Sequence, residues 1–317
     1  MDRTLSAAAI DGPGLDDLLV KTSRTFALSI PMLPQPLRAE VGIAYLLFRI
    51  ADTFEDAVGW TRDRRLRALA ELGELLADPR GAEARAAGWL AGRPAIAHEG
   101  YLELLGAAPG VLAAYGAMRP AARATVREHL AGTLAGMARY VGRAAGADGL
   151  ALGDLEELRD YCYVVAGIVG EMLTELFLLG LVELAPAAAD LRARARAFGE
   201  GLQLVNILKD SAFDRAEGRC YLPVDVPREA VVLLARRDLE RAAEYTGRLQ
   251  GAGAPRGLVA FTALPVLLAR QSLERVVERG EGAKLSRAEV LATVSALDEA
   301  LDRGLAAVPP AGSAPPA

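Results

Sequence analysis

The spacing of apolar residues predicts that the chain is built from helices. Apolar side chains recur every three or four positions through residues 36–56, as at Leu37, Val41 and Ala44, which is the period of one helix face. Pro36 suits the start of that helix, because the first N–H groups of a helix have no partner within it. The same period predicts further helices over residues 62–76, 121–141, 155–181, 186–214, 229–249, 255–279 and 286–305. The alternation of apolar and polar residues that is typical of strands is absent from the sequence.

The predicted helices are joined by short segments, and no evident linker divides the chain. Residues 142–149 are expected to form such a loop, and Asp154 followed by Glu157 three residues later is the pattern of a helix-capping box. We therefore expect a single all-α domain of about ten helices over residues 1–307. Residues 308–317 are rich in Pro and Ala and are expected to be a disordered tail.

Composition narrows the class of protein. The chain has 317 residues, of which 52% are apolar and 24% charged, the balance of a folded globular protein. A formal net charge of −5 is a poor match to the phosphate backbone of nucleic acids. Two cysteines and two histidines are too few for a disulfide framework or a His/Cys zinc site. The longest apolar run near the C-terminal end, residues 257–269, is interrupted by Pro265 and is shorter than the roughly 20 residues that span a bilayer, so we expect a cytoplasmic protein.

Two sets of acidic residues end apolar helices at a regular spacing. Asp52 and Asp56 are four residues apart and share one helix face, where like charges repel each other. Asn206, Asp210 and Asp214 repeat this spacing over two turns. Carboxylate and amide oxygens are the ligands that Mg²⁺ prefers in proteins. One such pair usually faces solvent, but two sets in this setting favour a metal site over that alternative.

Cationic and phenolic side chains accompany both acidic sets. Arg49 precedes the first set by three residues, and Tyr45 lies one turn before it. Lys209 lies inside the second set, and Arg219 follows it by five residues. Carboxylates, Mg²⁺ and guanidinium groups together bind a diphosphate. Such a site stabilises the charge that develops on the leaving group when an allylic diphosphate ionises.

Four sequence blocks resemble the squalene/phytoene synthase family of head-to-head prenyltransferases. They are TSRTF at residues 22–26, YLLFRIADTFED at 45–56, YCYVVAGIVG at 161–170 and QLVNILKDSAFDRAEGRCYLP at 203–223. All four occur in the order of the family. The DTFED and YCYVVAGIVG segments are nearer to the squalene synthase type than to the phytoene synthase type.

The resemblance implies a fold and a set of site residues. The fold would be the all-α isoprenoid synthase fold, in which helices surround a central cavity and the two aspartate motifs face each other across its mouth. The implied Mg²⁺ ligands are Asp52, Asp56, Asn206, Asp210 and Asp214. The implied contacts to diphosphate or substrate are Ser23, Arg24, Thr25, Tyr45, Arg49, Gln203 and Lys209.

The resemblance also implies two catalytic residues, Tyr161 and the flap residue Arg219. Tyr161 matches a family tyrosine placed near the carbocation. The π face of a phenol stabilises a cation, and its oxygen can relay a proton to the released diphosphate. The alternative for Tyr161 is a buried aromatic side chain whose hydroxyl bonds a backbone carbonyl.

Two features depart from the family pattern. Lys209 stands where Arg is usual, so the charge is kept but the bidentate fork is lost. Glu171 and Glu175 follow the third block, where squalene synthases of the family tend to be apolar or basic. At 100° per residue, Glu175 lies about 40° and Glu171 about 80° from Tyr161 around the helix. Either they pair with arginines of a neighbouring helix, or one points inward, where it would stabilise a cation or activate water.

The resemblance implies an enzyme that condenses two farnesyl diphosphates head to head with Mg²⁺. The product would be presqualene diphosphate and then squalene or a related C30 compound, with NADPH as the reductant. The alternatives are a phytoene-type synthase using geranylgeranyl diphosphate, a class I terpene synthase acting on one prenyl diphosphate, and an inactive helical partner protein. We expect a monomer or homodimer that binds no nucleic acid and that contacts membranes when its apolar product leaves.

Overall fold

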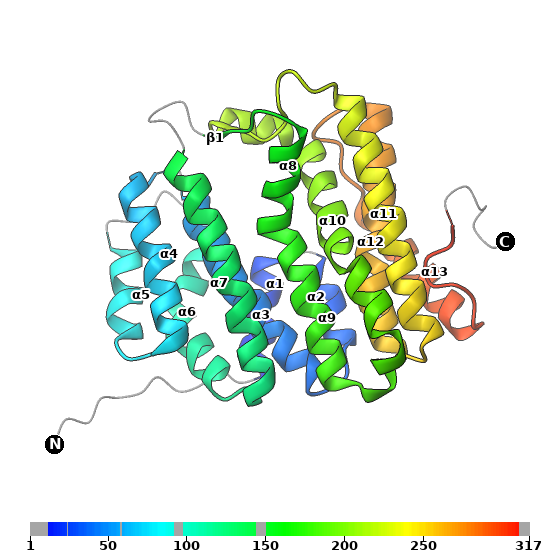
Figure 1. Ribbon diagram of the computed structural model, residues 1–317, viewed down its shortest axis with the longest axis horizontal. Coiled ribbons are helices and arrows are strands. Elements are labelled where there is room, and N and C mark those ends of the chain that lie inside the picture. The colour runs from blue at the N-terminus through cyan, green and yellow to red at the C-terminus, as the bar shows by residue number, and fades with distance from the viewer. Residues whose placement is uncertain (1–11, 24, 58, 92–97, 144–149, 311–317) are drawn as a thin grey trace. The chain divides into compact units, whose positions relative to one another are not determined.

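The computed structural model describes residues 12–23, 25–57, 59–91, 98–143 and 150–310. The chain forms two compact units, which are treated separately below. Unit 1 comprises Met1–Pro31 and Gln35–Ala144, and unit 2 comprises Met32–Pro34 and Ala145–Ala317. Nearly all regular structure in the described residues is helical, which confirms the predicted all-α class (Figure 1).

Unit 1 is a bundle built around one buried helix. Its helices are α1 (Gly12–Thr22), α2 (Phe26–Ser29), α3 (Leu37–Glu55), α4 (Arg62–Ala77), α5 (Ala82–Leu90), α6 (Glu99–Gly116) and α7 (Pro120–Arg143), and a 3₁₀ turn, Ile30–Met32, follows α2. Helix α3 contacts α1, α4, α6 and α7 and is buried along most of its length. Because α3 packs on several sides, its interior positions are apolar around much of its circumference.

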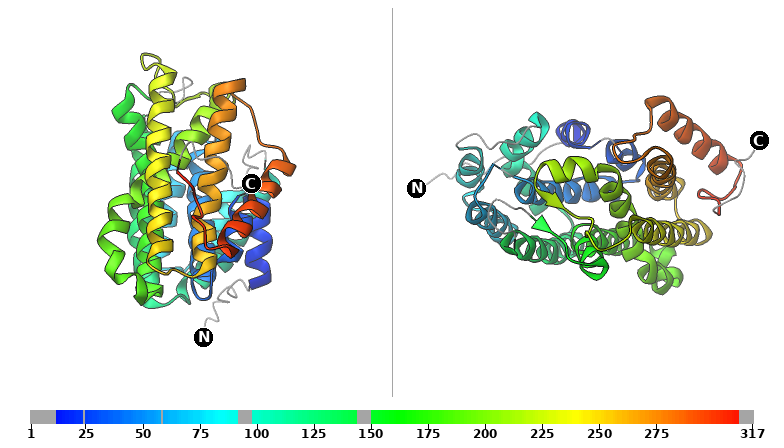
Figure 2. Two further views of the ribbon diagram at one scale, coloured as in Figure 1. Left: turned by 90° about the vertical axis from the view of Figure 1, so that its right-hand side faces the viewer. Right: turned by 90° about the horizontal axis from the view of Figure 1, so that it is seen from above.

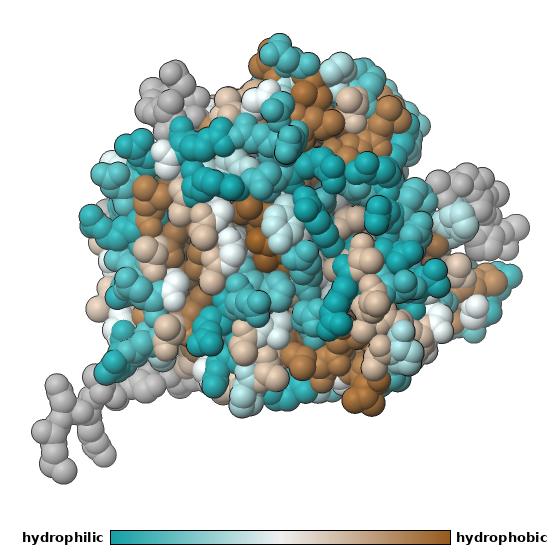
Figure 3. All heavy atoms as spheres, in the orientation of Figure 1, coloured by the Kyte–Doolittle hydropathy of each residue, from teal (hydrophilic) through white to brown (hydrophobic). Residues whose placement is uncertain are grey.

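Unit 2 is organised around the long helix α10. Its elements are β1 (Leu150–Ala151), α8 (Leu155–Cys162), a π-helical turn (Tyr163–Gly167), α9 (Ile168–Gly180), a 3₁₀ segment (Val182–Ala187), α10 (Ala188–Ala216), β2 (Arg219–Cys220), α11 (Arg228–Gly251), α12 (Arg256–Arg279) and α13 (Arg287–Asp302). Helix α10 contacts α9, α11 and α12, and the second view in Figure 2 looks down on the ends of several of these helices. Most of the surface seen in Figure 3 is polar, although Phe213 and Val224 in unit 2 are exposed.

The start of α8 was predicted correctly, with one difference in the cap. The Asp154 side chain accepts a hydrogen bond from the Glu157 N–H at 2.8 Å, as expected of an N-cap. The Glu157 carboxylate accepts from the N–H of Gly153 at 2.6 Å rather than from Asp154. The returning bond of the capping box is therefore displaced by one residue.

Two features of unit 2 were not predicted. The strands β1 and β2 pair in parallel, with Leu150 opposite Arg219, and are too short to show a sequence period. The π-helical turn Tyr163–Gly167 interrupts an otherwise continuous helix from Leu155 to Gly180. Such a turn inserts one extra residue into the helix, and no residue type or spacing in the sequence marks it.

The end of the described chain is ordered beyond the predicted boundary. The disordered tail was expected from residue 308, but Val308 is buried and the Pro309 carbonyl accepts a hydrogen bond from Arg270 at 2.6 Å. Residues 311–317 lie outside the described residues. The expectation of one domain over residues 1–307 stays a prediction, because each unit is compact by itself.

One helix in the described residues, Leu155–Gly180, is long and apolar enough to span a membrane. Of its most apolar window, 56% is buried inside the structure. A helix in the core of a soluble protein can be equally long, apolar and buried, so the segment is only weak evidence of a membrane span.

Candidate functional site

The first acidic motif forms a charged cluster on the second half of α3 in unit 1. One guanidinium nitrogen of Arg49 lies 3.2 Å from Oδ2 of Asp52, one turn later on the same helix face. The Nε of Arg49 donates a hydrogen bond to the Tyr45 hydroxyl at 3.3 Å. Tyr45, Arg49 and Asp52 therefore lie in a row, as the sequence predicted.

Two tyrosine rings flank the guanidinium of Arg49. Its central carbon lies 5.5 Å from the ring centroid of Tyr45 and 5.7 Å from that of Tyr101, which comes from α6. Both distances allow cation–π attraction. Tyr101 was not predicted, because it lies in a segment that carries no motif. Its ring is the second aromatic group that lies close to the guanidinium of Arg49.

Burial shifts the proton affinities in this cluster. Burial raises the pKa of Asp52 to about 6, Arg49 opposes the rise and the neighbouring Asp56 adds to it. Burial alone would lower the pKa of Arg49, but Asp52 and the two phenol groups raise it, so the guanidinium stays charged. The surroundings of Asp52 therefore disfavour its ionised form, and a bound divalent cation would stabilise that form.

The segment before α2 lies against Tyr45. The Tyr45 hydroxyl donates to the backbone carbonyl of Thr22 at 2.9 Å, and its ring centroid lies 5.6 Å from that of Phe26. The Ser23 hydroxyl accepts from the N–H of Phe26 at 2.9 Å and so caps the start of α2. Thr25 immediately precedes α2 but makes no capping bond with its side chain.

Asp56 and Arg24 are the remaining predicted site residues of unit 1. Asp56 is exposed at the residue that ends α3, where its N–H bonds the carbonyl of Asp52 at 2.8 Å. Arg24 lies outside the described residues. Unit 1 thus brings together Ser23, Tyr45, Arg49 and Asp52, with Asp56 at their solvent side.

The second acidic motif occupies the last turns of α10 in unit 2. Asn206 is exposed, whereas Asp210 and Asp214 are half-buried. The Lys209 ammonium donates to Oδ1 of Asn206 at 3.2 Å and lies 3.2 Å from Oδ2 of Asp210. Gln203, one turn earlier on the same helix, is half-buried. The lysine therefore balances the charge of Asp210 and donates a hydrogen bond to the amide oxygen of Asn206.

Arg219 closes the second motif from the strand that follows α10. Its guanidinium lies 3.3 Å from Asp214 and 2.6 Å from Glu217. The pairing of β2 with β1 fixes its backbone. The side chain is mostly buried, so its charge acts in a medium of low dielectric constant.

Tyr161 is buried and stacks on a second tyrosine of the flap. Its ring centroid lies 4.7 Å from that of Tyr221, with the planes inclined at 25°. Tyr221 follows Arg219 by two residues, so one short segment carries both. The fourth block contains Tyr221, but its spacing gave no sign of the contact with Tyr161.

The two unusual glutamates both have polar partners in unit 2. The π-helical turn lies between Tyr161 and both glutamates, so the angles expected for a regular α-helix do not apply to them. Glu175 accepts two hydrogen bonds from Arg192 of α10, at 2.6 and 2.8 Å. Glu171 accepts from the hydroxyl of Tyr163 at 3.1 Å. The alternative of an ion pair with a neighbouring helix is confirmed for Glu175.

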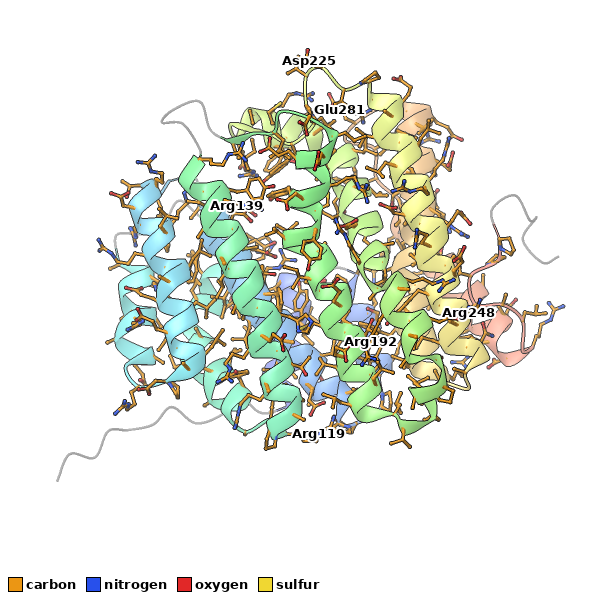
Figure 4. All side chains as sticks on the ribbon, in the orientation of Figure 1. Arg119, Arg139, Arg192, Asp225, Arg248 and Glu281 are labelled. Atoms are coloured by element: carbon orange, nitrogen blue, oxygen red, sulfur yellow. The ribbon has the colours of Figure 1, made fainter. Side chains whose placement is uncertain are left out.

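A further acidic residue anchors the second motif. Glu281, which follows α12, accepts hydrogen bonds from Ser211 and from Arg215, the latter at 2.7 Å (Figure 4). These bonds lower its pKa. The N–H of Gly282 donates to the carbonyl of Lys209 at 2.7 Å. The segment after α12 therefore holds the acidic end of α10 in place.

The oxygen donors suit Mg²⁺ but do not form a complete metal cage. In the part of the chain that the structure describes, no group of three or more His, Cys, Asp and Glu side chains is placed to hold a metal ion. Mg²⁺ commonly takes one or two protein carboxylates and completes its shell with water and phosphate oxygens. The half-buried Asp52 of unit 1 and the Asp210 and Asp214 of unit 2 fit that chemistry.

Comparison with known proteins shows to which family the chain is similar. Residues 19–232 match the family model described as squalene/phytoene synthase. The squalene synthase of Schizosaccharomyces pombe is 30% identical over 209 residues, which are 66% of this chain and 43% of that protein. The phytoene synthase of Thermus thermophilus is 40% identical over 77 residues, 24% of each chain. The matched region thus spans less than half of these relatives' length.

Solved structures share the fold. That of TcSQS with a bound ligand has a TM-score of 0.75 at 23% identity and covers 92% of this chain and 87% of its own. A dehydrosqualene synthase with a bound ligand has a TM-score of 0.58 at 21% identity, covering 92% of this chain and 96% of its own. These likenesses confirm the predicted isoprenoid synthase fold, and the family match covers all four sequence blocks. The chain belongs to the squalene/phytoene synthase family.

Proposed function

We propose that the protein condenses two farnesyl diphosphates head to head to presqualene diphosphate, and then to squalene or a related C30 product. The observation that supports this most directly is the pairing of carboxylates with cations in both acidic motifs. Arg49 lies against Asp52 in unit 1, and Arg219 lies against Asp214 in unit 2. Each motif thus carries both the ligands for Mg²⁺ and the guanidinium groups for a diphosphate.

The first bond to break would be the C1–O bond of one farnesyl diphosphate. Bound Mg²⁺ would supply charge neutralisation for the departing diphosphate. The cations of each motif, Arg49 in unit 1 and Lys209 and Arg219 in unit 2, would donate hydrogen bonds to the phosphate oxygens that the motif binds, as negative charge develops there. The double bond of the second farnesyl chain then attacks the cation, a proton is lost, and presqualene diphosphate forms.

Tyr161 is proposed as the residue that acts on the cation and the proton. It is buried and stacks on Tyr221, so its ring is held in one orientation. The ring faces stabilise positive charge, and the hydroxyl can pass the released proton to the departing diphosphate. Because Tyr161 and Arg219 are linked through the flap, the two groups act in the same part of unit 2.

A phytoene-type reaction on geranylgeranyl diphosphate is the second candidate. It is favoured by the 40% identity to a phytoene synthase over 77 residues. It uses the same ionisation chemistry and needs no reductant. The use of NADPH, the peripheral contact with membranes and the cytoplasmic location remain predictions.

Product analysis tests the proposal. The purified protein would be incubated with farnesyl or geranylgeranyl diphosphate, with Mg²⁺ or with a chelator, and with or without NADPH, and the extract analysed by mass spectrometry. We expect a C30 product from farnesyl diphosphate that is lost with the chelator. A C40 product would favour the phytoene-type reaction, and a C15 product or none would contradict head-to-head condensation.

A further inference from the structure

The π-helical turn Tyr163–Gly167 packs on α10 through close contacts between backbones. A β-carbon placed on Gly199 would lie 1.9 Å from the carbonyl oxygen of Ala166, so this position of α10 has no room for a side chain. The next residue of α10, Glu200, lies against Gly167, the last residue of the turn. A β-carbon on Gly167 would lie 3.2 Å from its Oε1.

An ion pair on α10 contacts both ends of this turn. Glu200 accepts a hydrogen bond from Arg196, one turn earlier on the same helix. The guanidinium carbon of Arg196 lies 4.5 Å from the ring centroid of Tyr163, the first residue of the turn. Glu200 touches the last residue, Gly167. The pair therefore spans the turn from its first to its last residue.

The charge of Glu200 is unusual for its depth in the unit. Only 3% of its side chain is exposed, and burial raises its pKa, an effect that Arg196 opposes. Arg159 of α8 also acts favourably on the carboxylate, and Asp238 of α11 acts unfavourably. An apolar side chain could fill the same space without this penalty. We therefore explain the carboxylate by the orientation that it imposes: an ion pair fixes how its two partners lie, whereas the packing of a methyl group does not.

We infer that Glu200, together with Arg196, is a positioning residue that holds the π-helical turn in register and thereby fixes the orientation of Tyr161. Tyr161 comes two residues before the turn and belongs to the same continuous helix. A turn that relaxed to α-helical geometry would rotate one part of the helix against the other by about 100°. Helix α10 also carries the second acidic motif. The contact of Arg196 and Glu200 with the π-helical turn therefore fixes the position of Tyr161 relative to that motif as well.

The test compares two variants of Glu200 with a matched control. Glu200→Leu keeps the bulk and removes the ion pair, and Glu200→Gln keeps the shape and removes the charge. Glu175→Gln is the control, because Glu175 also joins α9 to α10 through an arginine but lies away from the turn. We would measure kcat and KM for farnesyl diphosphate, and hydrogen–deuterium exchange of the peptides that cover residues 159–170.

We expect kcat of Glu200→Leu to fall at least about tenfold while KM stays within about twofold, because misplacement of a catalytic group lowers turnover more than binding. Exchange in residues 159–170 should rise in Glu200→Leu and, to a smaller extent, in Glu200→Gln, and not in the control. Unchanged exchange in both variants, or a loss shared by Glu175→Gln, would overturn the inference.

The activity readout depends on the proposed function, whereas the exchange readout does not. If the unmodified protein makes no prenyl product, the proposed function fails and exchange alone decides whether Glu200 braces the turn. If Glu200→Leu does not fold, Glu200→Gln decides, because it preserves shape and can still accept a hydrogen bond from Arg196.

Discussion

At the scale of single residues, the chemistry of unit 1 depends on how Arg49 is surrounded. Its guanidinium contacts a carboxylate, Asp52, and faces two phenol rings, Tyr45 and Tyr101. The rings restrict its side chain without neutralising its charge. Arg49 is therefore held ready for an anionic ligand at little further entropic cost.

The acidic motifs give the first prediction at this scale. Asp52→Asn and Asp210→Asn each remove one proposed Mg²⁺ ligand with almost no change in shape. We expect kcat to fall at least about 100-fold in each, because the leaving diphosphate loses charge stabilisation. The helical circular dichroism spectrum should be unchanged, which separates loss of chemistry from loss of fold.

Asp63→Asn is the control for these two variants. Asp63 lies in the first turn of α4 in unit 1, and 84% of its side chain is exposed. Its replacement should leave turnover within about twofold, since isolated surface charges contribute little. Full activity of either motif variant would show that the metal assignment is wrong.

The sequence identified the residues of the acidic motifs but not their neighbours. The spacing of Asp52 and Asp56 or of Asp210 and Asp214 is a local property of a helix, so it can be seen without the fold. The contact of Tyr101 with Arg49 joins α6 to α3, and that of Glu281 with Arg215 joins the end of α12 to α10. Neither has a sequence signal, because a helical period does not say which helix lies opposite.

At the scale of elements, α10 determines the arrangement of unit 2. It carries the second acidic motif at one end and receives the π-helical turn in its middle. Gly170 of α9 reinforces this packing, since a β-carbon there would lie 2.1 Å from the carbonyl oxygen of Ala195 on α10. Small residues at this crossing allow the two backbones to touch.

Two helical glycines of unit 2 should respond in opposite directions to alanine. Gly199→Ala places a methyl group 1.9 Å from a carbonyl oxygen, so the helices must separate, and we expect a loss of roughly 1–3 kcal/mol in the free energy of unfolding. Gly247→Ala on α11 meets no atom within 4 Å and should gain about 0.4–1 kcal/mol. Urea unfolding of both variants measures the difference.

The result that matters is whether each substitution raises or lowers the free energy of unfolding. Equal stabilisation by both variants would mean that the higher helix propensity of alanine, and not the close contact with Ala166, decides at Gly199. A stabilised Gly199→Ala variant would contradict the close packing of the π-helical turn on α10. It would also remove an observation on which the positioning role of Glu200 rests.

At the scale of the whole molecule, a buried ion pair joins distant parts of the chain within unit 1. The Glu40 carboxylate on α3 is 4% exposed and accepts two hydrogen bonds from Arg119, at 2.6 and 2.7 Å. The two residues are 79 positions apart. The pair ties the helix that carries the first acidic motif to the segment before α7.

Arg119→Ala should therefore destabilise the protein measurably. The variant leaves a buried carboxylate without its bidentate partner, and because Arg119 itself is 44% exposed we expect a moderate loss of roughly 1–3 kcal/mol. Thermal unfolding followed by circular dichroism would measure it.

Arg80→Ala is the comparison, because Arg80 pairs with Asp78 two residues away and 89% of its side chain is exposed. We expect a change within about 0.5 kcal/mol. If the two variants were equally stable, the contact between Glu40 and Arg119 would contribute nothing beyond an ordinary surface pair.

The sequence alone determined the helical class, the caps and motifs, and the family. These features depend on residues within a few turns of one another: the apolar period of α3, the N-cap at Asp154, and the aspartates four apart. Such patterns are visible because a helix fixes the relative direction of its own side chains.

Only the tertiary structure decided which of these side chains meet and how they are oriented. A π-helical turn separates Tyr161 from Glu171 and Glu175, the flap places Tyr221 on Tyr161, and Glu200 lies against Gly167. These outcomes depend on contacts between elements far apart in sequence. A periodic pattern records that a face is buried and does not record its partner, so only the folded chain supplies that information.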